Sequence, residues 1–152
     1  MNIRIATAAD LPELAALFRQ TVLTQGPEYY SPDQVQAWAA TAAADGFRQL
    51  ILGVTTYLAV DPGGIAGFGG ISRTGHVASL YVHHGRLHQG VGSILMAVIL
   101  DHGQTQGLPR LYGEASEFSL GLFQKFDFTC YGSEVVERHG VEFRRYLVER
   151  YL

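Results

Sequence analysis

The sequence has little of what marks secreted, membrane-spanning or nucleic-acid-binding proteins. Its only cysteine is Cys130, so the chain can form no internal disulfide and no cysteine-rich metal site. Charged residues make up 16% of the chain and the formal net charge is −3, which provides no strong positive field for nucleic acid or an anionic membrane. The longest apolar run, residues 94–100, is too short to span a bilayer, and the first residues lack the apolar core of a secretory signal. We therefore expect a cytoplasmic protein that binds neither nucleic acid nor membrane.

What is present is enough for one folded domain. The chain has 152 residues, of which 47% are hydrophobic, so it can bury a core that offsets the entropy of ordering. It also has 18 glycines, which suit tight turns and close approach of the backbone to a ligand. No repeat, low-complexity tract or linker interrupts the sequence, and residues 1–152 are predicted to form a single domain.

Hydrophobic periodicity and turn residues predict alternating strands and helices. Strong boundary signals are the helix start Ser31-Pro32-Asp33-Gln34 and the hairpin turn Asp61-Pro62-Gly63-Gly64. Strands are expected at residues 2–6, 55–60, 65–71, 76–83, 109–115, 128–137 and 141–149. Helices are expected at residues 7–23, 31–42, 45–52, from 91 to about 103 or 107, and at 117–126.

This order predicts an α/β (α+β) fold, with a mixed, mostly antiparallel central sheet and helices on both faces. Two helical crossovers, after His83 and after Ala115, predict two pairs of parallel neighbouring strands. The closing hairpin, turned at His139-Gly140, completes the sheet and is rich in tyrosine. We expect that this hairpin can pair with a second copy of the chain in a homodimer.

Gly90 and Gly92 lie where a loop becomes a strongly apolar helix, after a predicted buried strand. That position directs free backbone N–H groups and the positive end of the helix dipole at one point, where a diphosphate can bind. The loop is not a Walker A loop, because no lysine stands near Gly92. It is not a dinucleotide fingerprint either, because Leu95 replaces the third glycine and no βαβ unit precedes it. A pyrophosphate loop of the form R/Q-x-x-G-x-G/A fits in order and spacing, and a glycine-rich helix start without a ligand is the alternative.

The chain resembles the GNAT N-acetyltransferases over nearly its whole length. Residues 3–10 are similar to the family's opening strand and helix start, and residues 80–83, Leu-Tyr-Val-His, resemble its fourth strand, L-Y-V-x-P. Residues 114–116 and 122–128 resemble the late F-Y-E-K-x-G-F segment, and residues 29–38 are similar to a subgroup of small bacterial members. The resemblance implies acetyl-CoA as co-substrate and no metal. It assigns contacts with the cofactor to Leu80, Tyr81, Val82, Leu87, His88, Gln89, Gly90, Val91, Gly92 and Ser93.

The sequence departs from the family at positions that concern proton transfer. Leu87 replaces the first Arg or Gln of the loop, while His84 and Asp127 replace the family's usual proline and glycine. Ala78 stands where the family often places a basic carboxylate on the fourth strand. Phe123 stands where a tyrosine often protonates the leaving thiolate.

Two residues are candidates for the general base. His76 lies two positions before Ala78 and faces the same way if the strand is regular, and an imidazole titrates near neutral pH. Glu114, at the end of the fifth predicted strand, can accept a proton or bind a cationic substrate. A solvated turn histidine and a surface carboxylate are the plainer interpretations.

Other residues have weaker signals. Tyr29, Tyr30 and Trp38 are predicted to line the acceptor pocket, although the helical spacing of Trp38 also fits a core residue. Cys130 is expected to be a packed strand residue rather than a nucleophile. We expect solvated side chains without a metal or anion site at His83, His84, His88, Arg138, Arg144 and Arg145.

The predicted function is transfer of an acyl group, most simply acetyl, from acyl-CoA to a primary amine by direct attack in a ternary complex. The acceptor can be a small molecule or a peptide, and the mildly acidic chain slightly favours a cationic one. The alternative is a non-catalytic acyl-CoA-binding module with the same fold, which the residues at 78, 87 and 123 favour.

Overall fold

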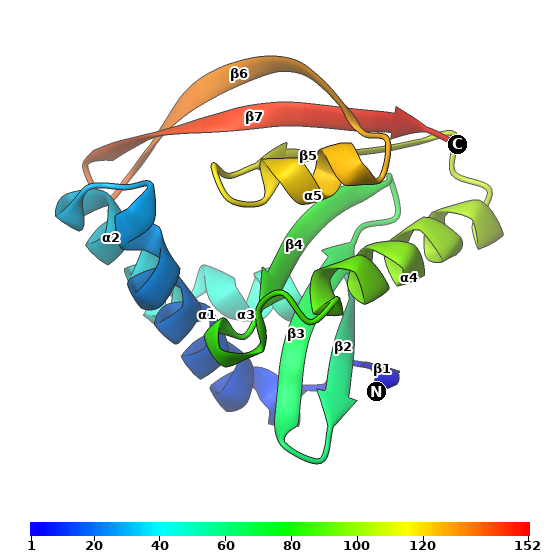
Figure 1. Ribbon diagram of the computed structural model, residues 1–152, viewed down its shortest axis with the longest axis horizontal. Coiled ribbons are helices and arrows are strands. Elements are labelled where there is room, and N and C mark those ends of the chain that lie inside the picture. Colours follow the sequence, from blue (N-terminus) through cyan, green and yellow to red (C-terminus); the bar gives the residue numbers. More distant parts are fainter.

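A single seven-stranded sheet, in the order β1-β2-β3-β4-β5-β7-β6, organises the computed structural model, which describes residues 1–152 (Figure 1). All neighbouring strands are antiparallel except β4 and β5, which are parallel. The strands are β1 (Asn2–Ile5), β2 (Thr55–Asp61), β3 (Gly64–Ile71), β4 (His76–Val82), β5 (Arg110–Ala115), β6 (Thr129–Arg138) and β7 (Val141–Tyr151).

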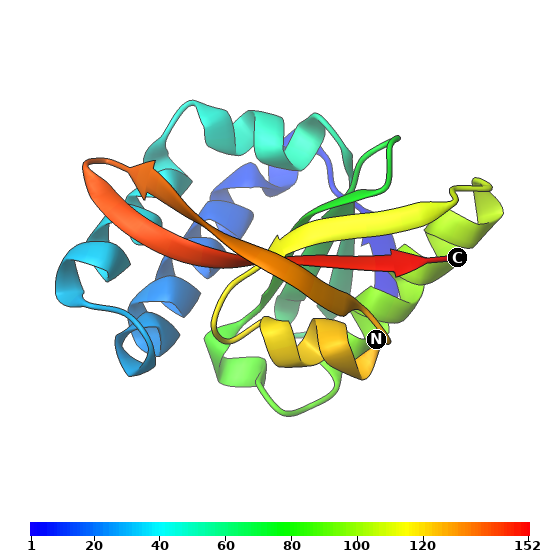
Figure 2. The ribbon, with the colours of Figure 1, turned by 90° about the horizontal axis from the view of Figure 1, so that it is seen from above.

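Helices cover both faces of the sheet, as predicted (Figure 2). On one face lie α1 (Leu11–Gln25), α2 (Pro32–Ala39) and α3 (Gly46–Leu52); on the other lie α4 (Val91–Thr105) and α5 (Leu120–Lys125). Alternation along the strands explains this arrangement. Leu58 belongs to the core beneath α1, whereas the next residue, Ala59, packs with the α4 side chains Val91 and Leu95.

The local signals for helix starts are confirmed in atomic detail. Ser31 caps α2 by accepting a hydrogen bond from the Gln34 N–H at 3.2 Å, and the Gln34 side chain accepts one from the Ser31 N–H at 2.9 Å. Asp10 similarly accepts a bond from the Thr7 N–H at 2.8 Å before α1. Residues 26–28, with Pro27, form a 3₁₀ turn that ends α1.

The second predicted pair of parallel strands is wrong. β6 does pass through a helical crossover after β5, but β7 lies between them and pairs antiparallel with both. Parallel neighbours arise only at the first crossover, between β4 and β5. A hairpin can insert either of its strands next to an existing edge, and the hydrophobic pattern does not distinguish the two insertions.

Two further expectations need correction around α5. The helix begins at Leu120 rather than 117, because the hydroxyls of Ser116 and Ser119 accept bonds from each other's N–H, at 3.2 and 2.8 Å. Cys130 is exposed rather than packed, and its thiol donates to the Gly132 carbonyl at 3.4 Å.

β4 and β5 are joined over only two residue pairs and then separate. His76 pairs with Tyr112 and Val77 with Gly113, and no further pairing follows. On its other side β4 has a β-bulge, since Ile71 pairs with Val77 and Gly70 with Ser79, which leaves Ala78 unpaired. The strand is therefore not regular between His76 and Leu80.

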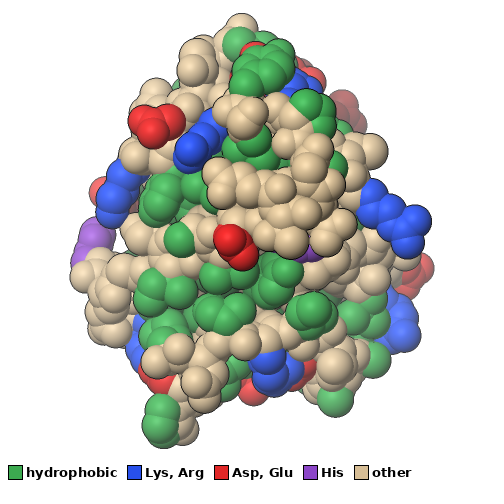
Figure 3. All heavy atoms as spheres, turned by 90° about the vertical axis from the view of Figure 1, so that its right-hand side faces the viewer, with side chains coloured by type: hydrophobic (Ala, Val, Ile, Leu, Met, Phe, Trp, Pro, Cys, Tyr) green, Lys and Arg blue, Asp and Glu red, His purple; other side chains and the backbone are tan.

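The outer surface shows no single strongly charged region on the face drawn in Figure 3, the right-hand side of Figure 1. Hydrophobic side chains are distributed across this face, and Lys and Arg side chains are scattered, mostly toward its rim. None of the helices has the length and apolar character needed to cross a membrane.

Candidate active site

Two adjoining cavities open where β4 separates from β5. One, of about 310 Å³, lies beneath the β6–β7 hairpin, and we call it the hairpin cavity. The other, of about 650 Å³, lies beside the loop that leads into α4, and we call it the loop cavity. The two cavities meet, because both are lined by Leu80, Tyr81, Phe118 and Ser119.

The loop cavity contains the unpaired end of α4. Gly90 adopts a left-handed conformation with φ of 81°, and its carbonyl accepts the N–H of Ile94 at 3.0 Å, the first bond of the helix. No side chain caps this end, so the N–H groups of residues 91–93 have no partner within the helix. Together with the helix dipole they form a site suited to a phosphate group.

Two cationic side chains of this cavity were missed by the sequence analysis. Lys125, the only lysine of the chain, donates to the Ser93 hydroxyl at 3.0 Å. Arg86 is held by an ion pair with Asp61 and by a 3.3 Å bond to the Gln89 side chain. Lys125 belongs to α5, far along the chain, so only the packing of α5 against α4 brings it to the loop.

Nine of the ten residues assigned to cofactor contact line the loop cavity. Gln89 does not, because its side chain is engaged with Arg86. Gly92 permits the close approach of α5, since a Cβ there would lie 3.0 Å from Leu122. The residues that do line the cavity are Leu80, Tyr81, Val82, Leu87, His88, Gly90, Val91, Gly92 and Ser93.

β4 offers a free backbone edge to both cavities. Beyond Val77 the strand has no partner on the β5 side, while β3 continues to pair with it as far as Val82. Alternate N–H and C=O groups of residues 78–82 are therefore available to hydrogen-bond a ligand that lies between the separated strands.

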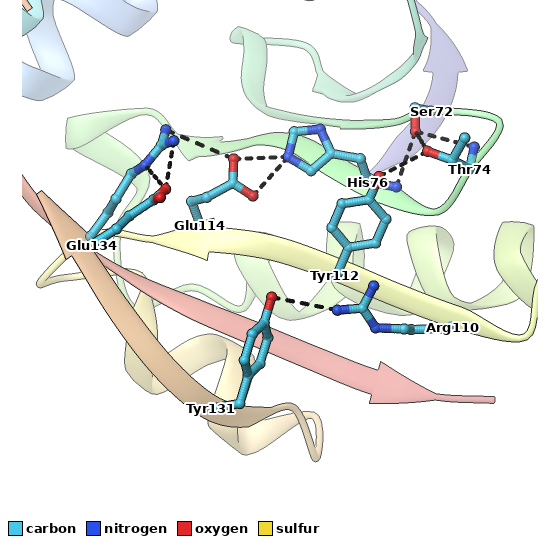
Figure 4. A network of polar contacts seen from close by, with 9 residues as sticks. Ser72, Thr74, His76, Arg110, Tyr112, Glu114, Tyr131 and Glu134 are labelled. Atoms are coloured by element: carbon cyan, nitrogen blue, oxygen red, sulfur yellow. Dashed lines mark hydrogen bonds and ion pairs between the residues drawn. The ribbon is translucent and has the colours of Figure 1, made fainter. Parts of the chain in front are cut away.

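The hairpin cavity brings together the two candidate bases. The imidazole Nε2 of His76 lies 3.0 and 2.9 Å from the two carboxylate oxygens of Glu114 (Figure 4). The guanidinium of Arg145 is 3.8 Å from the same carboxylate and 2.7 Å from Glu134. His76, at a strand end next to a turn, is thus half-buried and paired with Glu114 rather than fully solvated.

These contacts keep Glu114 ionised. Its hydrogen bond with His76 lowers the pKa of the carboxyl, burial opposes this effect, and the positive charges of Arg145 and Arg138 lower it further. A carboxylate facing Nε2 favours the tautomer with the proton on that nitrogen. Nδ1 of His76, which has no hydrogen bond within the chain, is then free to accept a proton.

Aromatic side chains form the opposite wall of the hairpin cavity. Trp38 stacks on Phe118 with a centroid distance of 5.3 Å and packs edge-on against Tyr30 at 5.2 Å. The Trp38 indole N–H donates to the Tyr81 hydroxyl at 3.3 Å, and burial raises the pKa of Tyr81 to about 12. Trp38 is therefore a wall residue, not only a core residue. Tyr29 lines the loop cavity instead of this one.

The residues that depart from the family pattern also lie here. Ala78 and Phe123 line the hairpin cavity, and neither has a proton to exchange. His83 and His84 are partly buried rather than solvated, with ring centroids 4.4 Å apart. No group of three or more His, Cys, Asp and Glu side chains is arranged to hold a metal ion.

This sheet, in which β4 and β5 pair at one end and then separate, places the protein in the class with a GNAT-type fold. The family described as the acetyltransferase (GNAT) domain matches residues 27–149 of the sequence. The chain belongs to the GNAT acetyltransferase family.

Solved structures of similar shape agree with this assignment. A GCN5-related N-acetyltransferase from Rhodopseudomonas palustris has a TM-score of 0.94 at 24% identity, over 99% of this chain and 95% of the other. An N-acetyltransferase from Staphylococcus aureus Mu50 has a TM-score of 0.70 at 20% identity, over 99% and 97%. The PaiA N-acetyltransferase from Thermoplasma acidophilum, in complex with coenzyme A, has a TM-score of 0.69 at 16% identity over the whole of both chains. A comparison with curated protein sequences gave no match.

Proposed function

We propose that this chain transfers the acetyl group of acetyl-CoA to a primary amine by direct attack in a ternary complex. The observation that carries the proposal is the meeting of two cavities at the free edge of β4. One is suited to a diphosphate and the other carries a histidine–carboxylate pair. Similar structures from Salmonella typhimurium and Thermoplasma acidophilum contain acetyl-CoA and coenzyme A.

The residues present fit coenzyme A. Its diphosphate matches the free N–H groups at the start of α4, with Lys125 and Arg86 beside them. Its pantetheine arm, which resembles a peptide, matches the unpaired edge of β4. Acetyl-CoA supplies an activated thioester when bound.

The protein's own groups then have defined tasks. The incoming amine is an ammonium ion near neutral pH, with a pKa of about 10.4 for a lysine-type amine, and must lose a proton before it attacks. His76, held by Glu114, accepts this proton at Nδ1 directly or through a water molecule. As the C–N bond forms and the C–S bond breaks, backbone N–H groups of β4 stabilise the developing negative charge on oxygen. The nitrogen, positively charged once the C–N bond has formed, loses its second proton to solvent, and the departing thiolate takes a proton from solvent, since Phe123 has none to give.

A non-catalytic acyl-CoA-binding module is the second candidate, favoured by Phe123 and Ala78 in the cavity wall. Isothermal titration with acetyl-CoA, followed by addition of a panel of amines, separates the two. Binding followed by release of free thiol and formation of an acetylated amine supports the enzyme. Binding without release across the panel supports the module, and the absence of binding contradicts both.

A further inference from the structure

The β6–β7 hairpin directs a selected set of charges into the hairpin cavity. Its register pairs Glu134 with Arg145, Val136 with Phe143 and Arg138 with Val141, and residues paired in this way share one face of the sheet. Arg144 pairs with Val135 on the opposite face, where its guanidinium donates to the Ser133 hydroxyl at 3.0 Å. Arg138, Arg144 and Arg145 all line the cavity, but the Arg144 guanidinium is bound to Ser133, whereas Arg138 and Arg145 share the face that covers the cavity.

All but one of these charges already have partners. Arg145 binds Glu134 at 2.7 Å and lies 3.8 Å from Glu114, and Glu114 in turn bonds to His76. Arg138 lines the cavity but makes no hydrogen bond or ion pair with its side chain. Arg138 is exposed and has no partner within the chain, so its positive charge is free to bind a ligand in this cavity.

The field of Arg138 reaches the centre of the cavity. It adds to the effects of the His76 hydrogen bond and Arg145 that lower the pKa of Glu114. It also opposes the rise in the pKa of the Tyr81 hydroxyl that burial causes. A negative group bound by Arg138 would accordingly lie within the same cavity as the histidine–carboxylate pair.

We propose that the acceptor is a small amine that also carries a carboxylate, with Arg138 binding the carboxylate and the amine directed toward His76. This inference rests on the proposed function and names its substrate class. The cavity, of about 310 Å³, is at the small end of ligand pockets and has the size for an amino acid rather than a folded protein segment. The aromatic wall of Trp38, Tyr30 and Phe118 suits an apolar side chain. The net charge of the chain slightly favours a cationic acceptor, but Arg138 at the cavity itself favours a zwitterionic one.

The test compares three amines that share one ring and differ in the carboxylate: phenylalanine, phenylalaninamide and phenethylamine. A matched set built on leucine varies the side chain. With acetyl-CoA present, thiol release gives kcat/KM for each amine. The carboxylate-bearing member of each set is expected to be preferred by about tenfold, the contribution of one charge-assisted hydrogen bond at a partly exposed site.

Variants of the hairpin identify the residue responsible. Arg138→Gln is expected to abolish the preference through a rise in KM of about tenfold for the amino acids alone, and Arg138→Lys to restore part of it. Arg138→Glu is expected to reverse the preference in favour of the amide and the simple amine. Arg73→Gln is the control, since it removes an exposed arginine that lines neither cavity.

A second measurement does not depend on turnover. Trp38 is the only tryptophan of the chain and lies in the cavity wall, so its fluorescence reports on occupation of this cavity. Titration of the three amines in the presence of CoA is expected to give the tightest binding for the amino acid, and weaker binding in Arg138→Gln. Equal affinities for the three amines, no binding of any amino acid, or an Arg138→Gln variant with unchanged preference would overturn the inference. Failure of acetyl-CoA itself to bind would instead overturn the proposed function, which isothermal titration detects separately.

Discussion

At the scale of single residues, both oxygens of Glu114 lie within 3.0 Å of one imidazole nitrogen, Nε2 of His76. A neutral imidazole carries one N–H, and this contact places that proton on Nε2 and the lone pair on Nδ1. The carboxylate also stabilises the imidazolium that forms after a proton is accepted. In the proposed reaction, Glu114 is therefore a positioning residue, whereas His76 is the group that exchanges protons with the substrate.

Replacement of His76 tests this division of roles. His76→Ala is expected to lower kcat by about 100-fold, the usual contribution of a general base, and to leave acetyl-CoA affinity unchanged. The rise of kcat/KM that accompanies deprotonation of the base should disappear in the variant. The measurement is a pH–rate profile for both proteins. His102→Ala, which removes the α4 histidine that is hydrogen-bonded to Tyr57, serves as the control. An unaltered profile in His76→Ala would exclude His76 as the base.

Glu114 also makes stability depend on pH. Its pKa in the folded chain lies below the usual value of 4.5, so its contribution is fully present above that value and is lost as the pH falls through the folded pKa. The free energy of unfolding of the parent chain should therefore decline more steeply below pH 4.5 than that of Glu114→Gln. Urea unfolding at a series of pH values measures this difference. Parallel curves for the two proteins would show that the carboxylate is not stabilised by its neighbours.

At the scale of elements, the start of α4 carries the cofactor proposal, and Gly90 allows a matched test. A Cβ at Gly90 meets no atom within 4 Å, so the cost of a substitution comes from its positive φ rather than from a clash. Asn and Asp have similar size and both tolerate this conformation better than other residues. Gly90→Asp should weaken CoA binding by about tenfold more than Gly90→Asn, because only Asp places a negative charge beside the phosphates. Isothermal titration with CoA gives both values, and equal affinities would contradict the assignment of the loop.

Element boundaries show which parts of the fold the sequence predicts. The capping box at Ser31, the turn at residues 61–64 and the glycine at the start of α4 are local signals, so the elements that they begin lie where expected. The bulge at Ala78 and the position of β7 between β5 and β6 depend on pairing between distant strands. The hydrophobic pattern is the same for either arrangement, and nothing local distinguishes them.

The same distinction holds for the site. Nine of the residues that line the loop cavity lie between positions 80 and 93 and were predicted from one segment of the sequence. The contact of His76 with Glu114 depends on the parallel pairing of His76 with Tyr112, which lies 36 positions later in the chain. Lys125 and Arg138 reach the cavities only through the packing of α5 and the hairpin.

At the scale of the whole molecule, β6 ends the sheet with an unpaired outer edge. Tyr131 and Val135 on this strand are 51% and 52% exposed. An unpaired edge with exposed apolar side chains can pair with a second copy, so the predicted homodimer would form here. Light scattering at micromolar concentration is expected to give twice the 16.6 kDa mass of the chain, and Val135→Lys to give the single mass. A monomer mass for the parent chain would rule out the dimer.

The proposed cofactor would contact both halves of the molecule and should stabilise it as a unit. The loop cavity is lined by β4 and the start of α4 from one part of the chain, and by Leu122 and Lys125 of α5 from another. A ligand that binds only the folded state adds about 2.7 kcal/mol at 100 times its Kd, which for a domain of this size raises Tm by roughly 5–10 °C. Thermal unfolding with and without CoA measures this shift, and adenosine, which lacks the diphosphate and the pantetheine, is the control. The rise in Tm should be smaller in Gly90→Asp than in Gly90→Asn, because a higher Kd lowers the stabilisation at a given CoA concentration. If millimolar CoA leaves Tm unchanged in the parent chain, the loop cavity does not bind the cofactor and the acetyltransferase proposal fails.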